Sequence, residues 1–271
     1  MTNKKTKDLK PDKKPFLTGG ITDETTPRSA LLFLGSLILV AFMTFLVSAS
    51  TAGGAGWLRI LVNVSIILLV LFIFFTNGAN KGTEAVSRGE ILWQRQEKGQ
   101  SFSDSEKKMC YHGLKGFTVG LLGTIPLFLI ALLLAFQTRL LTTDSGTIPS
   151  WLQSYLNREE VGGALMHYTQ PEGLSFVDYL RMIVRVCLMP FVNLVGGTNR
   201  TGILWIERLS PLLVLLPAVA YGFGYRTGRM NRSQVHTAIS EANRLRIRRE
   251  KKAQKARRGG NSHRREPEQL N

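Results

Sequence analysis

The sequence predicts an all-α integral membrane protein with about four transmembrane helices, a fifth hydrophobic segment that is interfacial or re-entrant, and a basic cytoplasmic C-terminal helix or tail. Three observations predict this fold class. Hydrophobic residues, 44% of the 271 in the chain, are concentrated in long blocks and do not recur at a helix or strand period. These blocks carry almost no charge. The formal net charge of +16 lies mainly in the two ends of the chain and one central segment.

Two uncharged blocks near the N-terminus predict a transmembrane helical hairpin over residues 31–76. Residues 31–48 and 60–76 each approach the length of about 20 residues that crosses a hydrocarbon layer of about 30 Å, and small residues at 49–56 join them. Residues 1–30 carry seven basic side chains, so we expect this tail to be cytoplasmic. A cleaved signal peptide is the alternative for the first block, but the polar leader is too long for the usual charged region of such a peptide.

Residues 77–115 also carry seven basic side chains and are expected to form a cytoplasmic loop. Within this loop, residues 83–98 mix charged with apolar side chains and are expected to form a short helix along the cytoplasmic membrane face. Helices of this kind couple permease domains to ATPase partners, but the same pattern also serves any loop that lies along a membrane. The run at 103–106 has the spacing of a capping box, so the helix that contains the third span, residues 116–138, is expected to begin near Asp104.

The segment at 176–195 is apolar apart from Asp178, Arg181 and Arg185. A charge near the middle of a span costs about 2.5 to 3.5 kcal/mol, and a large apolar residue returns only about 0.3 to 0.6 kcal/mol. The segment should therefore not cross the membrane unaided. Its charges recur at three and four residues, which places them on one face, as in a helix that lies in the interface. The alternative is a true span whose arginines line a polar cavity.

The stretch between the third span and this segment contains only two basic residues, so residues 139–205 are expected to be an external segment with interfacial helices. Trp151 and Tyr155 lie at one-face helical spacing and are expected to anchor a short helix to the outer headgroups. A small capping subdomain packed on the spans is the alternative. The single histidine and scattered carboxylates of this stretch form no recognisable catalytic pattern. We expect them to be solvated surface.

Residues 206–225 predict the fourth span, which Pro211 and Pro217 interrupt. Glu207 and Arg208 lie at its outer edge, where we expect them to pair with each other. Four spans leave both basic tails in the cytoplasm, whereas five would place the C-terminal tail outside. The chain is therefore expected to be a multi-pass protein of the cell membrane with cytoplasmic N- and C-termini.

The C-terminal tail, residues 226–271, contains fourteen Lys and Arg against four Glu. Apolar residues at helical spacing predict a basic amphipathic helix from about Ser233 to the Gly259–Gly260 pair. Docking on an anionic leaflet is the simplest interpretation, since each nearby Lys or Arg is worth about 1 kcal/mol there. RNA or the ribosome is an alternative partner, which the lack of interleaved aromatic residues disfavours. A plain solvated tail is the third possibility. The residues expected to contact the membrane surface are Arg244, Arg246, Arg248, Arg249, Lys251 and Lys252.

No motif in the sequence assembles a catalytic, cofactor or metal site, because HExxH, GxSxG, CxxC and phosphate-loop patterns are absent. Spans one to three contain no ionisable residue, which disfavours an autonomous ion or proton carrier. We therefore expect a non-enzymatic membrane component that acts through contacts with anionic lipids and with a protein partner in the membrane. The alternative is a membrane subunit of a transporter that needs a separate energising partner. Cys110 and Cys187 are expected to be free packing residues.

Overall fold

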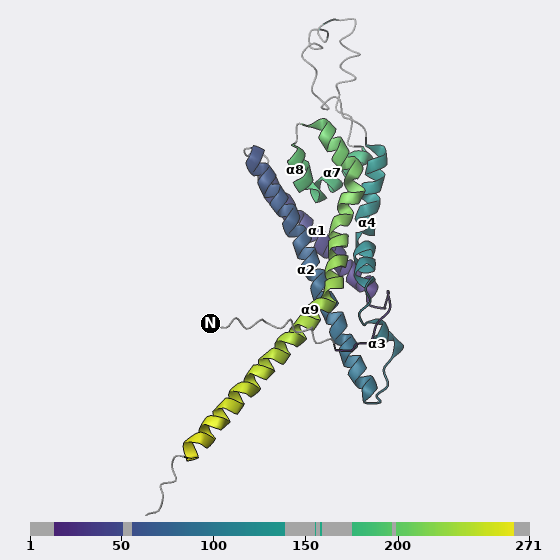
Figure 1. Ribbon diagram of the computed structural model, residues 1–271. Coiled ribbons are helices and arrows are strands. Elements are labelled where there is room, and N and C mark those ends of the chain that lie inside the picture. The colour runs from purple at the N-terminus through teal and green to yellow at the C-terminus, as the bar shows by residue number, and fades with distance from the viewer. Residues whose placement is uncertain are drawn as a thin grey trace, which may run out of the picture.

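The computed structural model of the protein describes residues 14–50, 56–138, 155, 158, 175–196 and 199–262. Within these residues every regular element is an α-helix, and the helices are α1 (Thr26–Ser50), α2 (Gly56–Glu97), α3 (Asp104–Lys108), α4 (Lys115–Gln137), α7 (Phe176–Cys187), α8 (Met189–Val195) and α9 (Arg200–Ser262). Four of them, α1, α2, α4 and α9, are long and apolar enough to cross a membrane (Figure 1). The predicted all-α membrane fold is thereby confirmed, and the expected outer helix near Trp151 lies outside the described residues.

The outer surface of the bundle is apolar, the reverse of a water-soluble protein. Leu31 on α1 and Phe136 on α4 are 72% and 83% exposed. Polar side chains lie inside instead: Asn63 is fully buried and donates to the Arg59 carbonyl at 2.7 Å, and the buried Thr124 hydroxyl donates to the Gly120 carbonyl. Apolar side chains are stable in contact with lipid, whereas lipid tails cannot form hydrogen bonds with polar groups. This arrangement is therefore that of a multi-pass membrane protein.

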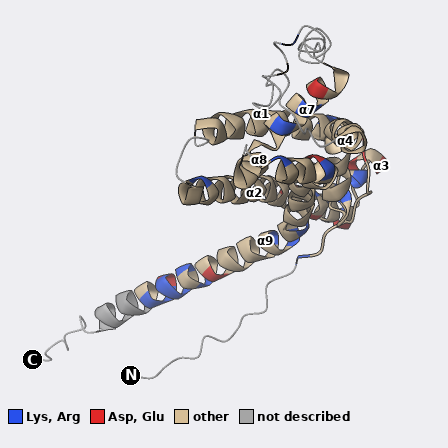
Figure 2. Ribbon diagram, turned by 90° about the horizontal axis from the view of Figure 1, so that it is seen from above, with Lys and Arg blue, Asp and Glu red and all other residues tan. Residues whose placement is uncertain are grey.

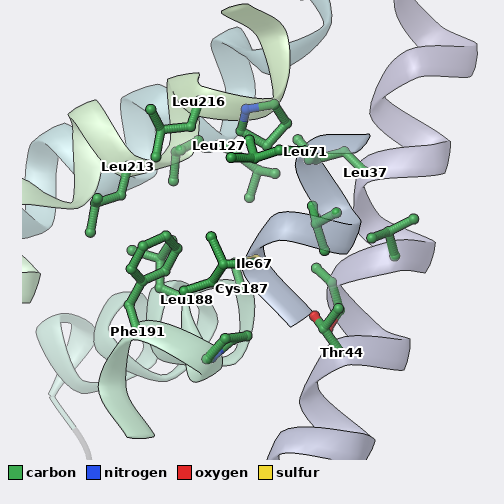
Figure 3. A pocket seen from close by; sticks show the side chains of 16 residues that line it. Leu37, Thr44, Ile67, Leu71, Leu127, Cys187, Leu188, Phe191, Leu213 and Leu216 are labelled. Atoms are coloured by element: carbon green, nitrogen blue, oxygen red, sulfur yellow. The ribbon is translucent and has the colours of Figure 1, made fainter. Parts of the chain in front are cut away.

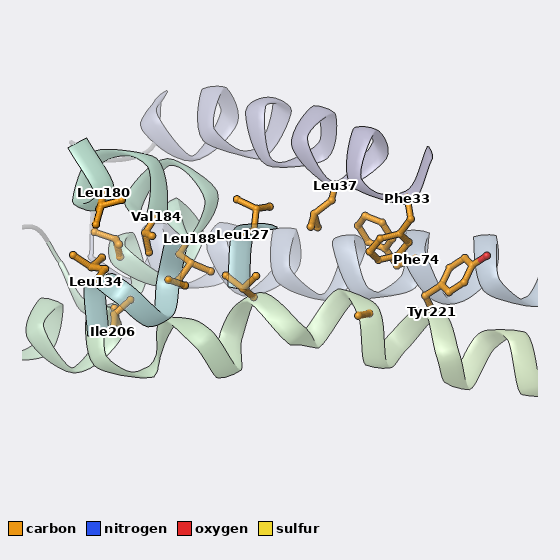
Figure 4. Close-up of a cluster of buried hydrophobic side chains, with 14 of the residues drawn as sticks. Phe33, Leu37, Phe74, Leu127, Leu134, Leu180, Val184, Leu188, Ile206 and Tyr221 are labelled. Atoms are coloured by element: carbon orange, nitrogen blue, oxygen red, sulfur yellow. The ribbon is translucent and has the colours of Figure 1, made fainter. Parts of the chain in front are cut away.

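The hydrophobic core runs along the length of the bundle (Figure 4). Near one end, Phe33 of α1 packs against Phe74 of α2 and Tyr221 of α9, with ring centroids 5.1 and 5.2 Å apart. Toward the other end, Leu134 of α4 lies close to Leu180 of α7. Each helix therefore buries one face and leaves the other to the lipid.

Helices α2 and α9 cross at a point where glycines let their backbones touch. A Cβ added at Gly78 would lie 2.1 Å from the Tyr221 carbonyl oxygen, and one at Gly228 would lie 2.4 Å from the carbonyl carbon of Gly82. The two α2 glycines are four residues apart, and Gly224 stands four residues before Gly228 in α9. Small residues at this spacing permit close helix packing in membranes. The crossing fixes the courses of α2 and α9, which diverge beyond it (Figure 1).

Two helices continue well past the apolar segments that predict them. The expected surface helix at 83–98 is the continuation of α2, which is unbroken to Glu97. Likewise α9 passes through Pro211 and Pro217 and reaches Ser262, so the tail helix begins neither at Ser233 nor as a separate element. Lys, Arg, Ala and Glu, which favour helix, make up 18 of the 37 residues at 226–262 and 8 of the 21 at 77–97. Contacts of Glu90 with Arg232 and His236 join the two continuations. We call them the α2 extension (residues 77–97) and the α9 extension (residues 226–262).

The predicted capping box forms, but it begins a different helix from the expected one. The Ser103 side chain accepts from the Ser105 backbone N–H, and the Glu106 side chain accepts from the Ser103 backbone N–H. The helix that starts here is α3, which ends at Lys108. A turn follows, and α4 starts separately at Lys115. The third span therefore has no extension of its own.

The contested segment at 176–195 forms two short helices, α7 and α8, which a break at Leu188 separates. The 12 residues of α7 cover about 18 Å at 1.5 Å per residue, less than the hydrocarbon thickness, and α8 has only seven residues. Leu180 and Val184 face inward into the core. The segment is therefore packed against the four long helices and does not add a fifth one of spanning length.

Different elements lie at the two ends of the bundle (Figure 1). We call the end that holds residues 14–25, α3 and the two extensions the basic end, and the end that holds α7 and α8 the opposite end. Viewed from above, the α9 extension leaves the bundle obliquely and carries a row of Lys and Arg along its length (Figure 2).

Candidate functional site

A cluster of charged side chains at the opposite end surrounds the carboxylate of Glu207, which is only 3% exposed. Arg181 donates to Glu207 from Nε at 3.1 Å, and Arg185 approaches it at 2.7 Å. The Thr138 hydroxyl, at the end of α4, donates to the other carboxylate oxygen. Asp178 pairs with Arg181 at 3.0 Å. The cluster joins α4, α7 and α9, and its two cations match two carboxylates.

The sequence indicated five polar residues here, and four of them, Asp178, Arg181, Arg185 and Glu207, come together. The expected pair between Glu207 and Arg208 does not form. Arg208 is exposed and makes no ion pair within the described part of the chain. Adjacent residues of a helix project about 100° apart, so Arg208 points away when Glu207 points inward. The cluster therefore holds α7 against α9. Because each of its cations already pairs with a carboxylate, it offers no free charged group to a ligand.

A second cluster lies at the basic end around Glu90, whose side chain is 8% exposed. His236 lies 2.7 Å from Glu90 Oε1, and Arg232 donates to Oε2 from Nε and Nη2 at 3.0 and 2.9 Å. The cluster ties the α2 extension to the α9 extension just beyond the glycine crossing. Sequence reasoning missed it, because Glu90 stands in a run of charged residues. One signal in the sequence could have revealed the cluster. Glu90 follows Gly82 and Val86 at four-residue spacing and therefore lies on the same face of α2 as these two residues.

The N-terminal segment, residues 14–25, is bound to the same end of the molecule. Leu17 and Gly19 donate from their backbone N–H groups to the carbonyls of Gly89 and Tyr111 at 3.2 and 2.9 Å. Phe16 packs edge-on against the Tyr111 ring, and the Arg229 guanidinium lies 5.4 Å from the Phe16 ring centroid. This segment therefore forms one wall of the basic end.

A buried ion pair fixes the point at which this segment enters α1. Lys115 Nζ lies 2.5 Å from Asp23 Oδ2, and the Asp23 side chain is 2% exposed. Burial alone would raise the pKa of Asp23, but hydrogen bonds from Lys115 and Thr26 and the Lys115 charge outweigh it and hold the pKa below its usual value. The carboxylate therefore stays ionised and joins the start of α1 to the start of α4.

The predicted membrane-contact residues all lie on the α9 extension, where every residue from Glu241 to Gln254 is exposed. Arg246 pairs with Glu250 at 3.2 Å, an exposed contact one turn apart. The apolar side chains of Val235, Ile239 and Leu245 are exposed on the same extension. The extension thus combines a large positive charge with unburied apolar side chains. The other predicted contact residues on it are Arg244, Arg248, Arg249, Lys251 and Lys252.

An apolar crevice of about 70 Å³ lies within the bundle, among α1, α2, α4, α9 and the break between α7 and α8 (Figure 3). Leu37, Ile67 and Phe191 are among its lining residues, and Thr44 supplies its single hydroxyl. That hydroxyl donates to the Ala41 carbonyl at 2.9 Å. The free thiol of Cys187 also lines the crevice, and the lining residues include no carboxylate, histidine, lysine or arginine.

In the part of the chain that the structure describes, no three His, Cys, Asp or Glu side chains are placed to hold a metal ion. Cys110 and Cys187 are free, and burial raises the pKa of the Cys110 thiol, which opposes its use as a nucleophile. No known protein family, curated protein or solved structure matches this chain. The basic end, with its exposed extension and its cations, is therefore the candidate functional site.

Proposed function

We propose that this protein is a non-enzymatic component of the cell membrane whose basic end faces the cytoplasm and whose α9 extension docks on the anionic leaflet. The observation that supports this most directly is the continuity of α9, which joins a membrane-spanning segment to an exposed basic helix without a break. A docked extension would hold the bundle in a fixed relation to the membrane surface and to any protein bound there.

The charge and shape of the extension support lipid docking. Six basic residues between Glu241 and Gln254 face solvent against two glutamates, Glu241 and Glu250. Basic side chains near an anionic leaflet gain about 1 kcal/mol each. The oblique course of the extension carries it beyond the footprint of the bundle, toward lipid next to the protein (Figure 2). The exposed Val235, Ile239 and Leu245 side chains have the chemistry required to enter the interface.

A pair of labelling sites on the extension tests this proposal in the full-length protein. In a Cys110→Ser, Cys187→Ala background, Ala242→Cys and Ser240→Cys each receive an environment-sensitive fluorophore. These positions are two residues apart and therefore face nearly opposite directions. In nanodiscs with phosphatidylglycerol the Ala242 label should shift to the blue and the Ser240 label should not, and phosphatidylcholine nanodiscs should give no shift at either site.

The shift should weaken as salt rises, since exposed charge is screened over about 8 to 10 Å near physiological ionic strength. The docking proposal fails if both labels respond alike, or if neither responds to anionic lipid. Tight binding of structured RNA at physiological salt by a protein that ignores anionic lipid would assign the extension to the ribosome.

The proposed orientation rests on the concentration of Lys and Arg at the basic end. Single-cysteine labelling tests it, with Ser154→Cys and Ser262→Cys made separately in the same cysteine-free background. An impermeant reagent applied to intact cells should label the Ser154 variant and spare the Ser262 variant. Labelling of the Ser262 variant would overturn the orientation.

The second candidate function is a membrane subunit of a transporter that a separate ATPase energises. The unbroken passage of α2 and α9 from their apolar segments into the extensions favours it, because motion of the joined extensions would reach the membrane-spanning segments. Purification in mild detergent followed by mass spectrometry separates the two functions. A stoichiometric ATPase would support the transporter subunit, and its absence together with anionic-lipid docking would support the first proposal.

A further inference from the structure

A cavity of about 300 Å³ opens at the root of the α9 extension, and its walls come from three separate parts of the chain. Lys14 and Phe16 come from the N-terminal segment, Glu90 from the α2 extension, and Arg229 and Arg232 from α9. It has the size of a small-ligand site. Three of its nine lining side chains are Lys or Arg, against one carboxylate.

The carboxylate in this cavity is already fully engaged. Both oxygens of Glu90 are hydrogen-bonded, one to His236 and the other to Arg232. Arg229 faces the Phe16 ring, and within the described residues neither Arg229 nor Lys14 has a carboxylate partner. Three cations thus share a cavity with one carboxylate. This is the opposite of the Glu207 cluster, where the charges balance.

We infer that this cavity binds a phosphate group. Guanidinium groups donate two parallel hydrogen bonds to phosphate oxygens, and an ammonium group adds a mobile positive charge. The two arginines are held before any ligand arrives, because Glu90 fixes Arg232 and the Phe16 ring supports Arg229. Arg232 uses Nε and Nη2 for Glu90 and keeps Nη1 for a ligand. Side chains held in this way lose less entropy on binding.

The position of the cavity defines two sources for the phosphate. The apolar segment of α9 ends at Tyr225, and Arg229 lies four residues further on, about 6 Å along the helix axis. Lipid phosphates reach this level, and so does a soluble phosphate compound on the same side of the membrane. The ligand is therefore either an anionic phospholipid headgroup or a small phosphate compound.

This inference does not depend on docking of the α9 extension. The proposed membrane-contact residues from Arg244 to Lys252 do not line the cavity, and the lining residues precede them by two turns or more. Neutralising Lys251 and Lys252 should therefore weaken docking of the extension and leave phosphate binding unchanged. Failure of one proposal is in this way distinguishable from failure of the other.

The test uses the full-length protein and a matched set of variants: Lys14→Gln, Arg229→Gln, the two combined, and the control Arg226→Gln. Arg226 is exposed, lies three residues before Arg229 on the same helix and does not line the cavity. In detergent, inorganic phosphate should raise the thermal midpoint of the wild type and of Arg226→Gln above that in sodium chloride of equal ionic strength. In the combined variant the apparent phosphate affinity should fall about tenfold or more, the size of one lost hydrogen bond to a charged group.

The second arm uses nanodiscs that contain phosphatidic acid, with native mass spectrometry to count the lipids that stay bound. The lipid is the source if the wild type and Arg226→Gln each retain one phosphatidic acid and the combined variant loses it. The source is soluble if the protein responds to inorganic phosphate alone. Either result supports the site. Equal behaviour of Arg226→Gln and the combined variant, or no response to either probe, overturns it. If the combined variant does not fold, Lys14→Gln alone decides between these outcomes, because this side chain is exposed and its replacement leaves the packing intact.

Discussion

The two ends of the molecule each bury one glutamate between helices, but they surround it differently. At the opposite end, Glu207 and Asp178 balance Arg181 and Arg185, and every charge of this cluster has a partner. At the basic end, Glu90 holds two partners, while Lys14 and Arg229 of the same cavity have no carboxylate partner among the residues that the structure describes. A balanced cluster stabilises a helix contact and has nothing left for a ligand. A cluster with surplus cations keeps the capacity to bind an anion.

The surroundings of the two glutamates also differ. Each glutamate has one buried and one more exposed partner: Arg181 and Arg185 are 11% and 35% exposed at Glu207, and His236 and Arg232 are 10% and 29% exposed at Glu90. The clusters differ in where they lie, because Glu207 belongs to the membrane-spanning part of α9, whereas Glu90 lies beyond the apolar segment of α2. Water can therefore reach the Glu90 cluster and replace lost partners in part. We expect the energetic cost of breaking each cluster to follow this difference.

The largest expected effect is that of Glu207→Gln. The substitution leaves two arginines in a poorly solvated site with one carboxylate, Asp178, so the free energy of unfolding should fall by about 3 to 5 kcal/mol. Thermal and denaturant unfolding in detergent measure it. The neighbouring exposed residue supplies the control, since Arg208→Gln should stay within about 0.5 kcal/mol of the wild type. Equal effects of the two substitutions would contradict the buried role of Glu207.

Asp23 is a third buried carboxylate, and unlike Glu207 and Glu90 it pairs with a single cation, Lys115. Asp23→Asn keeps an acceptor for Thr25 and Thr26 but leaves Lys115 buried without its counter-charge, which should cost about 2 to 3 kcal/mol at pH 7. Because the folded-state pKa of Asp23 lies below its ordinary value, the pair stabilises the protein fully above about pH 4. This contribution is lost as pH falls through the folded-state pKa.

The measurement is the difference in unfolding free energy between the wild type and Asp23→Asn at a series of pH values. The difference should be largest at neutral pH and should shrink as the solution becomes more acidic than the ordinary pKa of aspartate. A difference that does not change with pH would show that the substitution acts through packing and not through the ion pair.

Glu90→Gln should have a smaller effect, about 1 to 2 kcal/mol, because Arg232 can turn toward water. The glutamine retains one oxygen for a hydrogen bond but cannot engage Arg232 and His236 equally well. A double-mutant cycle with Arg232→Gln, followed by unfolding in detergent, isolates the contribution of the pair. A cost as large as that of Glu207→Gln would mean that the two ends do not differ in solvation.

The number of spanning helices was predictable because lipid exposure leaves long apolar blocks in the sequence. The two extensions were not, since a polar helix that continues a span has the same local composition as a separate surface helix. The charges of α7 stood out against an apolar background and were correctly placed together. Their main partner, Glu207, was wrongly paired with the adjacent Arg208, although neighbouring residues of a helix project about 100° apart. Which of the two faces inward depends on how α9 packs against α7. Glu90 gave no such contrast, and its burial depends on the packing of α2 against α9.

The smallest expected effect belongs to the exposed pair of Arg246 and Glu250 on the α9 extension, whose side chains are 77% and 58% exposed. An i, i+4 ion pair in water is worth only about 0.3 to 0.5 kcal/mol, since solvent screens it and both side chains lose freedom. Arg246→Gln, Glu250→Gln and the double variant, made in a peptide covering residues 230–260, should differ slightly in helicity by circular dichroism. The coupling should vanish in about 1 M salt, where charge is screened over about 3 Å. A coupling as strong as that of Glu90 with Arg232 would show that exposure to water does not weaken such a pair, and would break the contrast between buried and exposed charge.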